Sequence, residues 1–472
     1  MTHMPTSRRQ FLKSAGALTL SFGIPLMDVH SQSAVVQDKP RLAGDLQIHR
    51  KLNAWIRIDS ATQTVELRIG KVELGQGILT AVSQVCADEL DVDFAKIKLI
   101  SGDTALVPDE GVTAGSFSMP YCATAVQAAA AEVRAILLDL AGAKLSQAAA
   151  QLTVQNGLIR GSHGAQISYW DLVVGESLNR EATGLVKPKP IREHRYIGRS
   201  VPRPDLQAKV LGQAMFVQEQ RPKGMLFGQI VRPPNHGARL QSVNLNRVEK
   251  MPGVVKVVRN GSFLGVIAKR EAQAQAAAQA LQSLCEWHVP QTLPATQEMQ
   301  AWLLQTKPDV VIPTKKQTRA NSASANTPVA RVIEAQYYRP YHMHGSIGTS
   351  AAMATLSTEG VLTIQTHSQS VFQTGEAIAK LLNLPIDKVR MQHTQGSGCY
   401  GHNMADDAAA DAALLAMQVP GQSVRLQYTR EQEHAWEPYG SAMVMKTKAS
   451  LDAQGNVLDW DLQIWSTPHG TR

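Results

Sequence analysis

The chain has 472 residues, of which 44% are hydrophobic and 18% are charged, with a net charge of +8. This length and composition predict about three domains with substantial buried cores. The basic residues are dispersed and are not interleaved with aromatic side chains, so nucleic-acid binding is not expected. The charge favours, at most, an anionic ligand or an acidic partner.

The first 35 residues differ from the rest. Residues 7–13 read SRRQFLK and precede a short, moderately apolar stretch over residues 15–27. This pattern is typical of a twin-arginine export signal, the alternative being a chance Arg-Arg pair before a helix. Because that route carries folded proteins, it indicates a cofactor inserted before export. We expect a periplasmic protein, which stays at the membrane if the signal is not cleaved. After the signal, the sequence has no apolar run long enough to span a bilayer.

The cysteine spacing excludes several cofactors. Cys86, Cys122, Cys285 and Cys399 are far apart and form no C-x-x-C pair. The chain therefore lacks the ligand spacing for an iron–sulfur cluster, a structural zinc site or attached haem. A disulfide framework is also not expected in so large a domain.

The first half of the chain reads as a hairpin followed by helices. Apolar residues alternate over residues 52–72 around a polar turn at 59–62. The pattern then predicts a helix over residues 78–90, a strand over 97–100, a loop over 101–120 and an alanine-rich helix over 123–140.

A basic, proline-containing stretch over residues 180–205 resembles a linker. A second domain is expected from residue 206 to 289, and a polar loop or linker over residues 290–328. A third segment starts at residue 329. The elements expected after the linker are strands over 225–231, 254–258, 264–268, 352–354, 361–365, 389–393 and 460–465, and helices over 271–284, 374–382 and 405–417.

One glycine-rich stretch lies in the third segment: Gly396, Ser397, Gly398, Cys399, Tyr400 and Gly401. Glycines let the backbone approach a bulky ligand, and bare N–H groups suit a phosphate or pyrophosphate. Most such loops are only tight turns. The upstream loop Gly75-Gln76-Gly77 has a similar setting between a strand and a helix.

Gln369 lies between a predicted strand and a predicted helix. Its amide offers both donors and an acceptor, which suits an oxo or sulfido group. The alternative is that Ser368 or Ser370 simply caps the helix.

Two pairs of residues each have two possible roles. His342 and His344 would share one face of a strand and could form half of a metal site, but ordinary partly buried histidines are favoured. His402 and Asn403 either bind ligand phosphate or cap a turn.

The remaining charged residues have structural explanations. Asp406 and Asp407 suit the start of a helix because of its dipole. A structural ion-pair cluster is expected for Arg425, Arg430, Glu431 and Glu433. The chain shows no Ser-His-Asp arrangement, P-loop or Rossmann fingerprint.

Taken in order, these segments resemble the molybdenum-binding subunit of the xanthine dehydrogenase/aldehyde oxidase family, in its exported branch of isoquinoline 1-oxidoreductase and nicotinate dehydrogenase type. In that family, a Gly-Gln-Gly loop and a Thr-Ala-x-Ser loop contact the pterin cofactor. The corresponding residues here are Gly75, Gln76, Gly77, Thr113, Ala114, Gly115 and Ser116.

Two further motifs carry the resemblance. Gly396 to Gly401 resembles the family's glycine-rich loop, with the branch pattern Gly-Cys-Tyr-Gly-His-Asn. Gln369 resembles the glutamine that faces the apical oxo group of molybdenum. The resemblance implies an α+β, multi-domain architecture. Its expected parts are the signal over residues 1–35, a permuted molybdopterin-binding piece over 45–180, an α/β hammerhead domain over 195–290 and an incomplete molybdopterin-binding domain over 329–472.

The resemblance also implies an activity. Family members hydroxylate an N-heterocycle or oxidise an aldehyde with oxygen taken from water, and a carboxylate acts as general base. The expected cofactor is molybdopterin cytosine dinucleotide with an oxo-sulfido molybdenum, bound without direct protein ligands to the metal. The expected partners are a small [2Fe–2S] subunit, a cytochrome c as one candidate electron acceptor, and a cofactor-insertion chaperone.

The family's catalytic glutamate is the main departure. It lies in a Gly-Glu-x-Gly context near the family's C-terminus, whereas the Gly-Glu pairs here, Gly175-Glu176 and Gly375-Glu376, align with other regions. No general base is therefore assigned. The chain resembles the front portion of a longer subunit, and the alternative is a truncated or degenerate, non-catalytic exported binding protein.

Overall fold

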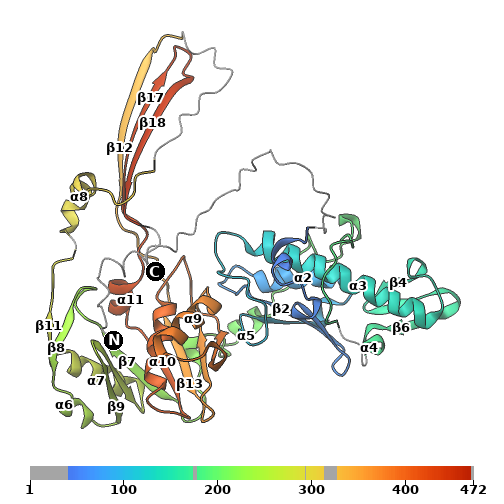
Figure 1. Ribbon diagram of the computed structural model, residues 1–472, viewed down its shortest axis with the longest axis horizontal. Coiled ribbons are helices and arrows are strands. Elements are labelled where there is room, and N and C mark those ends of the chain that lie inside the picture. The colour runs from blue at the N-terminus through green and yellow to red at the C-terminus, as the bar shows by residue number, and fades with distance from the viewer. Residues whose placement is uncertain (1–40, 174–177, 293, 313–326, 469–472) are drawn as a thin grey trace, which may run out of the picture. The chain divides into compact units, whose positions relative to one another are not determined.

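The computed structural model describes residues 41–173, 178–292, 294–312 and 327–468. The export signal predicted over residues 1–35 lies outside these residues. Helices and mostly antiparallel sheets together build the described part, so the fold class is α+β, as predicted (Figure 1).

The first sheet contains the predicted hairpin. Strands β1 (Ile56–Asp59) and β2 (Thr64–Ile69) pair antiparallel, and β3 (Ile97–Ser101) lies parallel to β2. Every second residue of β2 is buried, as the period of a strand requires. Leu52 and Trp55, which were expected in the first strand, instead lie in and just after a 3₁₀ turn, where both are buried.

Two helices pack together beside this sheet. Helix α2 (Ile78–Leu90) matches the predicted range, and α3 (Thr124–Leu145) extends five residues beyond the predicted end at residue 140, after a π-helical turn (Ser118–Ala123). By length and composition, the span Ser118–Leu145 could cross a membrane, contrary to the sequence expectation. Its alanine-rich face nevertheless packs in the hydrophobic core beside the first sheet.

Residues 180–205, predicted as a linker, are irregular but fixed to α2. The buried carboxylate of Asp88 accepts the backbone N–H groups of Arg195, Tyr196 and Ile197 at 2.7, 3.0 and 2.7 Å. A carboxylate that receives several amides orders the chain around it. The preceding segment forms a small sheet and helix: β4 (Thr153–Gln155), β5 (Leu158–Arg160), β6 (Gln166–Ser168) and α4 (Tyr169–Leu172).

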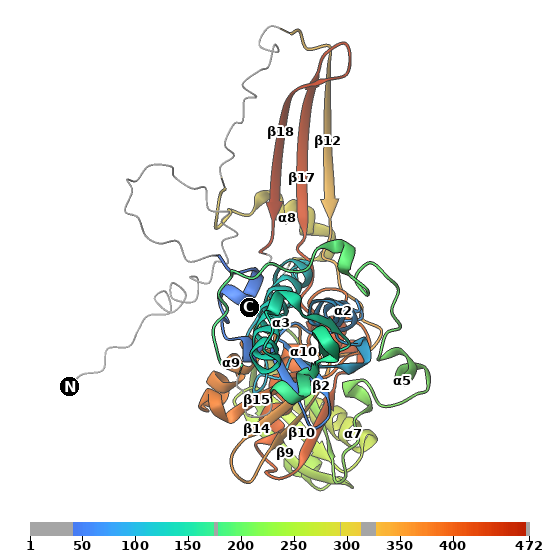
Figure 2. The same cartoon turned by 90° about the vertical axis from the view of Figure 1, so that its right-hand side faces the viewer.

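A seven-stranded sheet joins two distant segments in the order β15-β14-β13-β16-β7-β10-β9 (Figures 1 and 2). Its junction is the parallel pairing of β16 with β7. The strands are β7 (Leu226–Val231), β9 (Val254–Asn260), β10 (Phe263–Ala268), β13 (Ala351–Leu356), β14 (Leu362–Thr366), β15 (Val389–His393) and β16 (Ser423–Gln427), which confirms the predicted strands in both segments.

Helices cover this sheet. Small buried residues of α10 (Ala405–Ala416) let it approach β13 closely. The others beside it are α7 (Glu271–Gln282) and α9 (Val371–Leu382). Short elements complete this part: α5 (Leu206–Val210), β8 (Arg239–Val243), α6 (Asn246–Glu249) and β11 (Cys285–His288), with β8 and β11 paired.

A separate three-stranded sheet consists of β12 (Arg331–Arg339), β17 (Met443–Leu451) and β18 (Val457–Ser466). Residues 460–465, predicted as a strand, lie within β18. Helix α8 (Met299–Gln305) packs against β17 and β18, and α11 (Arg430–Trp436) follows β16. The four cysteines are free thiols.

Candidate cofactor site

Thr113 joins three of the predicted site segments. Its backbone N–H donates to the carbonyl oxygen of Gln369 at 2.9 Å, and its own carbonyl accepts Nε2 of Gln369 at 3.0 Å. Its hydroxyl accepts the N–H of Val72, which lies just before the Gly75–Gly77 loop, at 3.0 Å. Segments 256 residues apart in sequence are thereby held together.

Gln369 is therefore anchored by its amide nitrogen. Ser370 is the residue just before α9, but its side chain makes no capping hydrogen bond to the helix. The alternative in which Ser370 caps the helix is therefore wrong. The hydroxyl of Ser370 instead donates to Oε1 of Gln373 at 2.9 Å. The hydroxyl of Ser368 accepts the N–H of Ser370 at 3.0 Å and also contacts the carboxylate of Asp406.

The loop after Thr113 turns outward. Gly115 and Ser116 have φ angles of 63° and 60°, a left-handed conformation that glycine adopts readily and serine rarely. Ala114, Gly115 and Ser116 are exposed, whereas Thr113 is buried.

The polar groups of the Gly75–Gly77 loop are largely used within the chain. Oε1 of the buried Glu73 accepts the N–H groups of Gly75 and Gly77, both at 2.8 Å. The side chain of Gln76 bonds back to the N–H of Leu74 and the carbonyl of Val72. The two glycine amides are thus already paired with a carboxylate, at the start of α2 where a negative charge is favoured.

Arg203 completes this loop. Its Nη1 donates to the carbonyl of Gly75 at 3.0 Å, its Nη2 lies 3.6 Å from Glu73, and it also pairs with Asp205. Arg203 lies in the stretch over residues 180–205 that was predicted as a linker, and Glu73 was not among the predicted site residues. A carboxylate two residues before a Gly-x-Gly turn at a helix start is the sequence signal that could have pointed to Glu73.

The loop over residues 396–401 differs from the Gly75–Gly77 loop in the hydrogen bonding of its backbone amides. No backbone N–H of these six residues donates a hydrogen bond to another part of the described chain. Gly398 and Gly401 have φ angles of 117° and 138°, and a Cβ at Gly401 would lie 2.4 Å from the ring of His344. Free amides and obligatory glycines form the kind of cradle that suits an anionic group.

Loop 344–350 packs against this cradle and is held from behind by α11. Gly348 N–H donates to the carbonyl of Ser397 at 2.9 Å. Arg430 donates to the carbonyls of Ser346 and Ile347 at 2.6 and 2.5 Å.

Two glutamates complete this anchor. Glu433 accepts the N–H and the hydroxyl of Ser350, each at 2.9 Å, and Glu437 accepts the N–H of His344. Burial raises the pKa of Glu433 above its usual range, although the bonds from Ser350 oppose this. The predicted ion-pair cluster is wrong for Arg430 and Glu433, which bind loop backbone, whereas Arg425 pairs with Glu271 at 2.8 Å.

A neutral histidine lies beneath the cradle. Burial lowers the pKa of His367 to about 4, and the ring Nε2 accepts the N–H of Ala351 at 3.2 Å. The proton therefore resides on Nδ1, which has no partner among the described residues and faces Gly396, where a Cβ would lie 2.5 Å away. Burial and the neighbouring His367 likewise lower the pKa of His393 to about 3.

The other predicted residues have local roles. The strand expected at His342 and His344 is absent from the described chain, because β12 ends at Arg339 and Pro340 cannot donate to a ladder. Among the described residues, no three His, Cys, Asp or Glu side chains gather as a metal site.

Asn403 lies just before Met404, the N-cap residue of α10, and its side-chain oxygen accepts the N–H of Ala405 at 3.1 Å. His402 pairs with Asp406 at 3.1 Å. Asp406 and Asp407 lie in the first turn of α10, as predicted. The thiol of Cys399 donates to the carbonyl of Gly401 at 2.9 Å.

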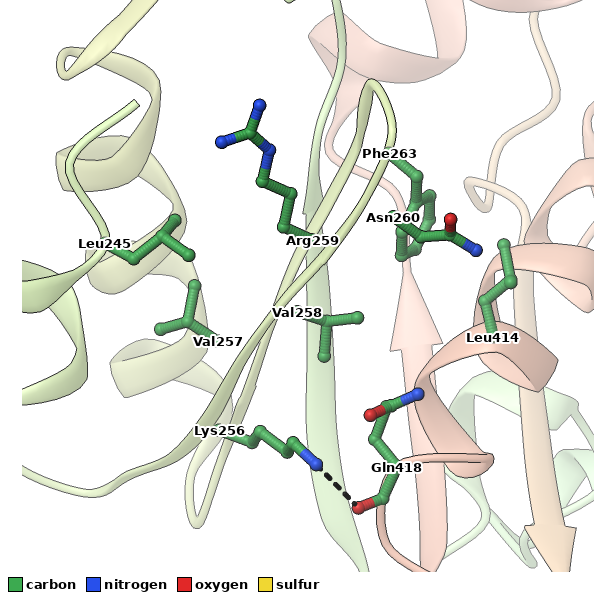
Figure 3. Close-up of a pocket in the computed structure, with 9 residues that line it drawn as sticks. All are labelled: Leu245, Lys256, Val257, Val258, Arg259, Asn260, Phe263, Leu414 and Gln418. Atoms are coloured by element: carbon green, nitrogen blue, oxygen red, sulfur yellow. Dashed lines mark hydrogen bonds between the residues drawn. The ribbon is translucent and has the colours of Figure 1, made fainter. Parts of the chain in front are cut away.

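Two cavities differ in their relation to these loops. One, of about 260 Å³, is lined by residues that include Glu73, Ser101, His393 and Gln395, and so it lies between the Gly75–Gly77 loop and the start of the cradle. The other, of about 400 Å³, lies between β9 and the end of α10 (Figure 3). No predicted site residue lines it, and Lys256 donates across it to the carbonyl of Gln418 at 3.5 Å.

The sequence matches two family models, each described as a molybdopterin cofactor-binding domain, over residues 30–200 and 304–469. A nicotinate dehydrogenase subunit from Pseudomonas putida is 34% identical over 404 residues, which are 84% of this chain and 33% of that protein. The beta subunit of isoquinoline 1-oxidoreductase from Brevundimonas diminuta is 23% identical over 532 aligned positions, covering 98% of this chain and 63% of that protein. The chain spans less than two thirds of the length of either relative.

Solved structures give weaker likenesses. Aldehyde oxidoreductase from Desulfovibrio desulfuricans matches with a TM-score of 0.47 and 19% identity, over 62% of this chain and 37% of that chain. Quinoline 2-oxidoreductase from Pseudomonas putida matches with a TM-score of 0.45 and 17% identity, over 57% and 39%. Because the sequence matches two molybdopterin cofactor-binding domains and these curated relatives, the chain belongs to the molybdopterin-binding large-subunit family of the molybdenum hydroxylases.

Proposed function

We propose that this chain provides the molybdopterin-binding part of a molybdenum hydroxylase that acts on an N-heterocycle or an aldehyde. The observation that carries the proposal is the double hydrogen bond between Thr113 and Gln369, which brings together loops that the resemblance assigns separately to the cofactor. When bound, the cofactor supplies the Lewis acidity and electron-accepting capacity for hydroxylation by water.

The predicted site segments differ in how well their free polar groups suit the cofactor. Loop 396–401 offers unpaired amides above a neutral His367, so it suits the pyrophosphate of a dinucleotide form, which we propose to be the cytosine form. The amides of Gly75 and Gly77 are occupied by Glu73, so that loop would contact the pterin by other groups. Gln369 would orient the metal end through the side-chain oxygen that its bond to Thr113 leaves available.

The partners and location are part of the same proposal. Both curated relatives are named as single subunits of their enzymes, which supports an assembly with further subunits. We propose that a small [2Fe–2S] subunit accepts the electrons, with a cytochrome c beyond it, and that a chaperone inserts the cofactor before twin-arginine export to the periplasm. No described residue is assigned as the general base.

Metal analysis tests the proposal directly. The chain is produced together with the proteins encoded beside it, and molybdenum and acid-released cytosine nucleotide are measured per mole of folded protein. We expect near-stoichiometric amounts of both. Folded protein with neither would overturn the proposal in favour of a non-catalytic binding protein.

A variant pair locates the site. Gly398→Val should reduce molybdenum and nucleotide content at least tenfold, because it fills and strains the cradle. The control, Gly421→Val, strains another turn with a positive φ (80°) that is open to solvent, and this variant should retain both. Equal losses in the two variants would contradict the assignment of loop 396–401.

A further inference from the structure

The seven-stranded sheet ends differently at its two edges. At β15 the chain covers the edge itself: the N–H of Thr104 donates to the carbonyl of Met391 at 3.0 Å, and the N–H of His393 donates to the carbonyl of Gly102 at 2.8 Å. At the other edge, β9 pairs only with β10, and no backbone group of the described chain bonds to its outer side. An open strand edge is a template for pairing with another chain.

The hairpin of β9 and β10 shows which backbone groups point outward. Asn260 pairs with Phe263 across a two-residue turn, so these two residues exchange hydrogen bonds, and bonded and unbonded residues alternate back along β9. The N–H and C=O groups of Val257 and Arg259 therefore point away from β10. A bulge near the start of β9 leaves residues 256–260 as the regular open edge.

The cavity of about 400 Å³ follows this edge and is lined from both faces of the strand (Figure 3). On one face, Val258 packs in the core formed with α10, and Leu414 of α10 lines the cavity. On the other face, Val257 packs with Leu245, which lies just before α6. Each face of the open edge therefore offers an apolar contact.

Each face also carries one cation. Lys256 shares its face with Val258 and donates to the carbonyl of Gln418 at 3.5 Å, whereas Arg259 shares its face with Val257 (Figure 3). Neither cation forms an ion pair with a described residue, and no described acidic side chain lines the cavity. The order along the edge is therefore cation, apolar, apolar, cation.

We propose that the edge of β9 binds an extended segment of a partner protein by strand addition, and that the segment has the order acidic, apolar, apolar, acidic. Residues directly opposite each other in neighbouring strands point to the same face. One acidic side chain would then face Lys256 and the other Arg259, with two apolar side chains on Val257 and Val258 between them. Because this order is the same in both directions, it holds for parallel and antiparallel addition.

A second copy of this chain is a poorer occupant of the edge. In the register that places the two valine pairs opposite each other, Lys256 of one copy would lie opposite Arg259 of the other, and like charges directly opposite are destabilising. The net charge of +8 adds to this repulsion. The inference does not depend on the proposed reaction, because no predicted site residue lines the cavity.

Peptide binding to the full chain tests the proposal. Two labelled peptides of identical composition have threonine flanks and differ only in their centre, which is Glu-Val-Ile-Glu in one and Val-Glu-Glu-Ile in the other. Fluorescence anisotropy should show at least tenfold tighter binding of the first. Equal affinities, or binding of neither peptide, would overturn the proposal and leave the two cations as protection of the edge against pairing.

Two variants separate charge from backbone pairing. Arg259→Ala removes one cation and should weaken binding of the first peptide by up to about fivefold, as expected for an exposed ion pair. Arg259→Pro also removes an outward N–H, which an edge strand tolerates, and should weaken binding at least tenfold further. Lys380→Ala, at an exposed position on α9, is the control and should bind as the wild type does. Equal binding by the two Arg259 variants would show that no strand is added.

Hydrogen exchange gives a readout without substitution. In the free chain, the amides of Val257 and Arg259 should exchange at least tenfold faster than the amide of Val258, which bonds to β10. The first peptide should slow these two amides at least tenfold and leave Val258 unchanged. If the two amides already exchange slowly in the free chain, or if the peptide does not slow them, the edge is not the docking site.

Discussion

Arg390 and Asp103 form a two-pronged ion pair across 287 residues of sequence. Nε and Nη2 of Arg390 donate to the two carboxylate oxygens of Asp103 at 2.9 and 2.6 Å, and Gln392 adds a third bond at 3.0 Å. The contact joins the segment after β3 to the strand β15, just before the cradle loop. Burial raises the pKa of Asp103, but the bonds from Arg390 and Gln392 outweigh it, so the pKa lies below its usual range.

Asp103→Asn should weaken this junction. The variant loses charge-assisted bonds that typically contribute about 1–2 kcal/mol after allowance for the partial exposure of Arg390. Because the folded pKa is depressed, the ionised carboxylate stabilises the fold above its unfolded pKa of about 3.9. That stability is lost as the pH falls through the lower folded value.

Urea unfolding at pH 7 and at pH 3 measures this effect. We expect the difference between wild type and Asp103→Asn to shrink at pH 3. Asp139→Asn, at an exposed position on α3, is the control and should match the wild type at both pH values. An Asp103→Asn variant as stable as the wild type at pH 7 would show that the pair does not hold the junction.

Glu73 is predicted to hold the Gly75–Gly77 loop in shape. Glu73→Ala leaves two glycine amides without their acceptor and Arg203 without one of its carboxylate neighbours. We expect a loss of about 1–3 kcal/mol in the free energy of unfolding and a molybdenum content at least fivefold below wild type. The control is Glu376→Ala on the exposed side of α9. A higher molybdenum content in Glu73→Ala would instead mean that the carboxylate competes with the cofactor for these amides.

Local patterns predicted the elements but not how they meet. The apolar spacing of residues 78–90 identified α2, and the alternation around Val65 identified the hairpin, because both signals lie within a few residues. The bond between Thr113 and Gln369 and the parallel pairing of β16 with β7 depend on contacts over long sequence separations, which no local pattern encodes. Glu73 was missed for a related reason: its role depends on the φ angles of the glycines that follow it.

His367 should make stability depend on pH. Its folded pKa of about 4 lies below the unfolded value of about 6.5, so the unfolded chain binds a proton more readily in this range. Stability should therefore fall as the pH falls from about 6.5 to 4, by up to about 3 kcal/mol from this group. Unfolding by urea at several pH values should show a shallower slope in His367→Gln. His288→Gln, at an exposed position on β11, should keep the wild-type slope.

Arg430 is predicted to position loop 344–350 against the cradle from outside the cofactor site. Arg430→Ala removes two donors to the carbonyls of Ser346 and Ile347, so the loop should lose its fixed position while α11 still forms. Hydrogen exchange of residues 346–350 should become at least tenfold faster, and bound molybdenum should be lost more readily during dialysis. Arg247→Ala, at an exposed position on α6, should change neither. If exchange in the loop is unchanged in Arg430→Ala, then the bonds of Glu433 to Ser350 are sufficient to hold it, and the arginine has no positioning role.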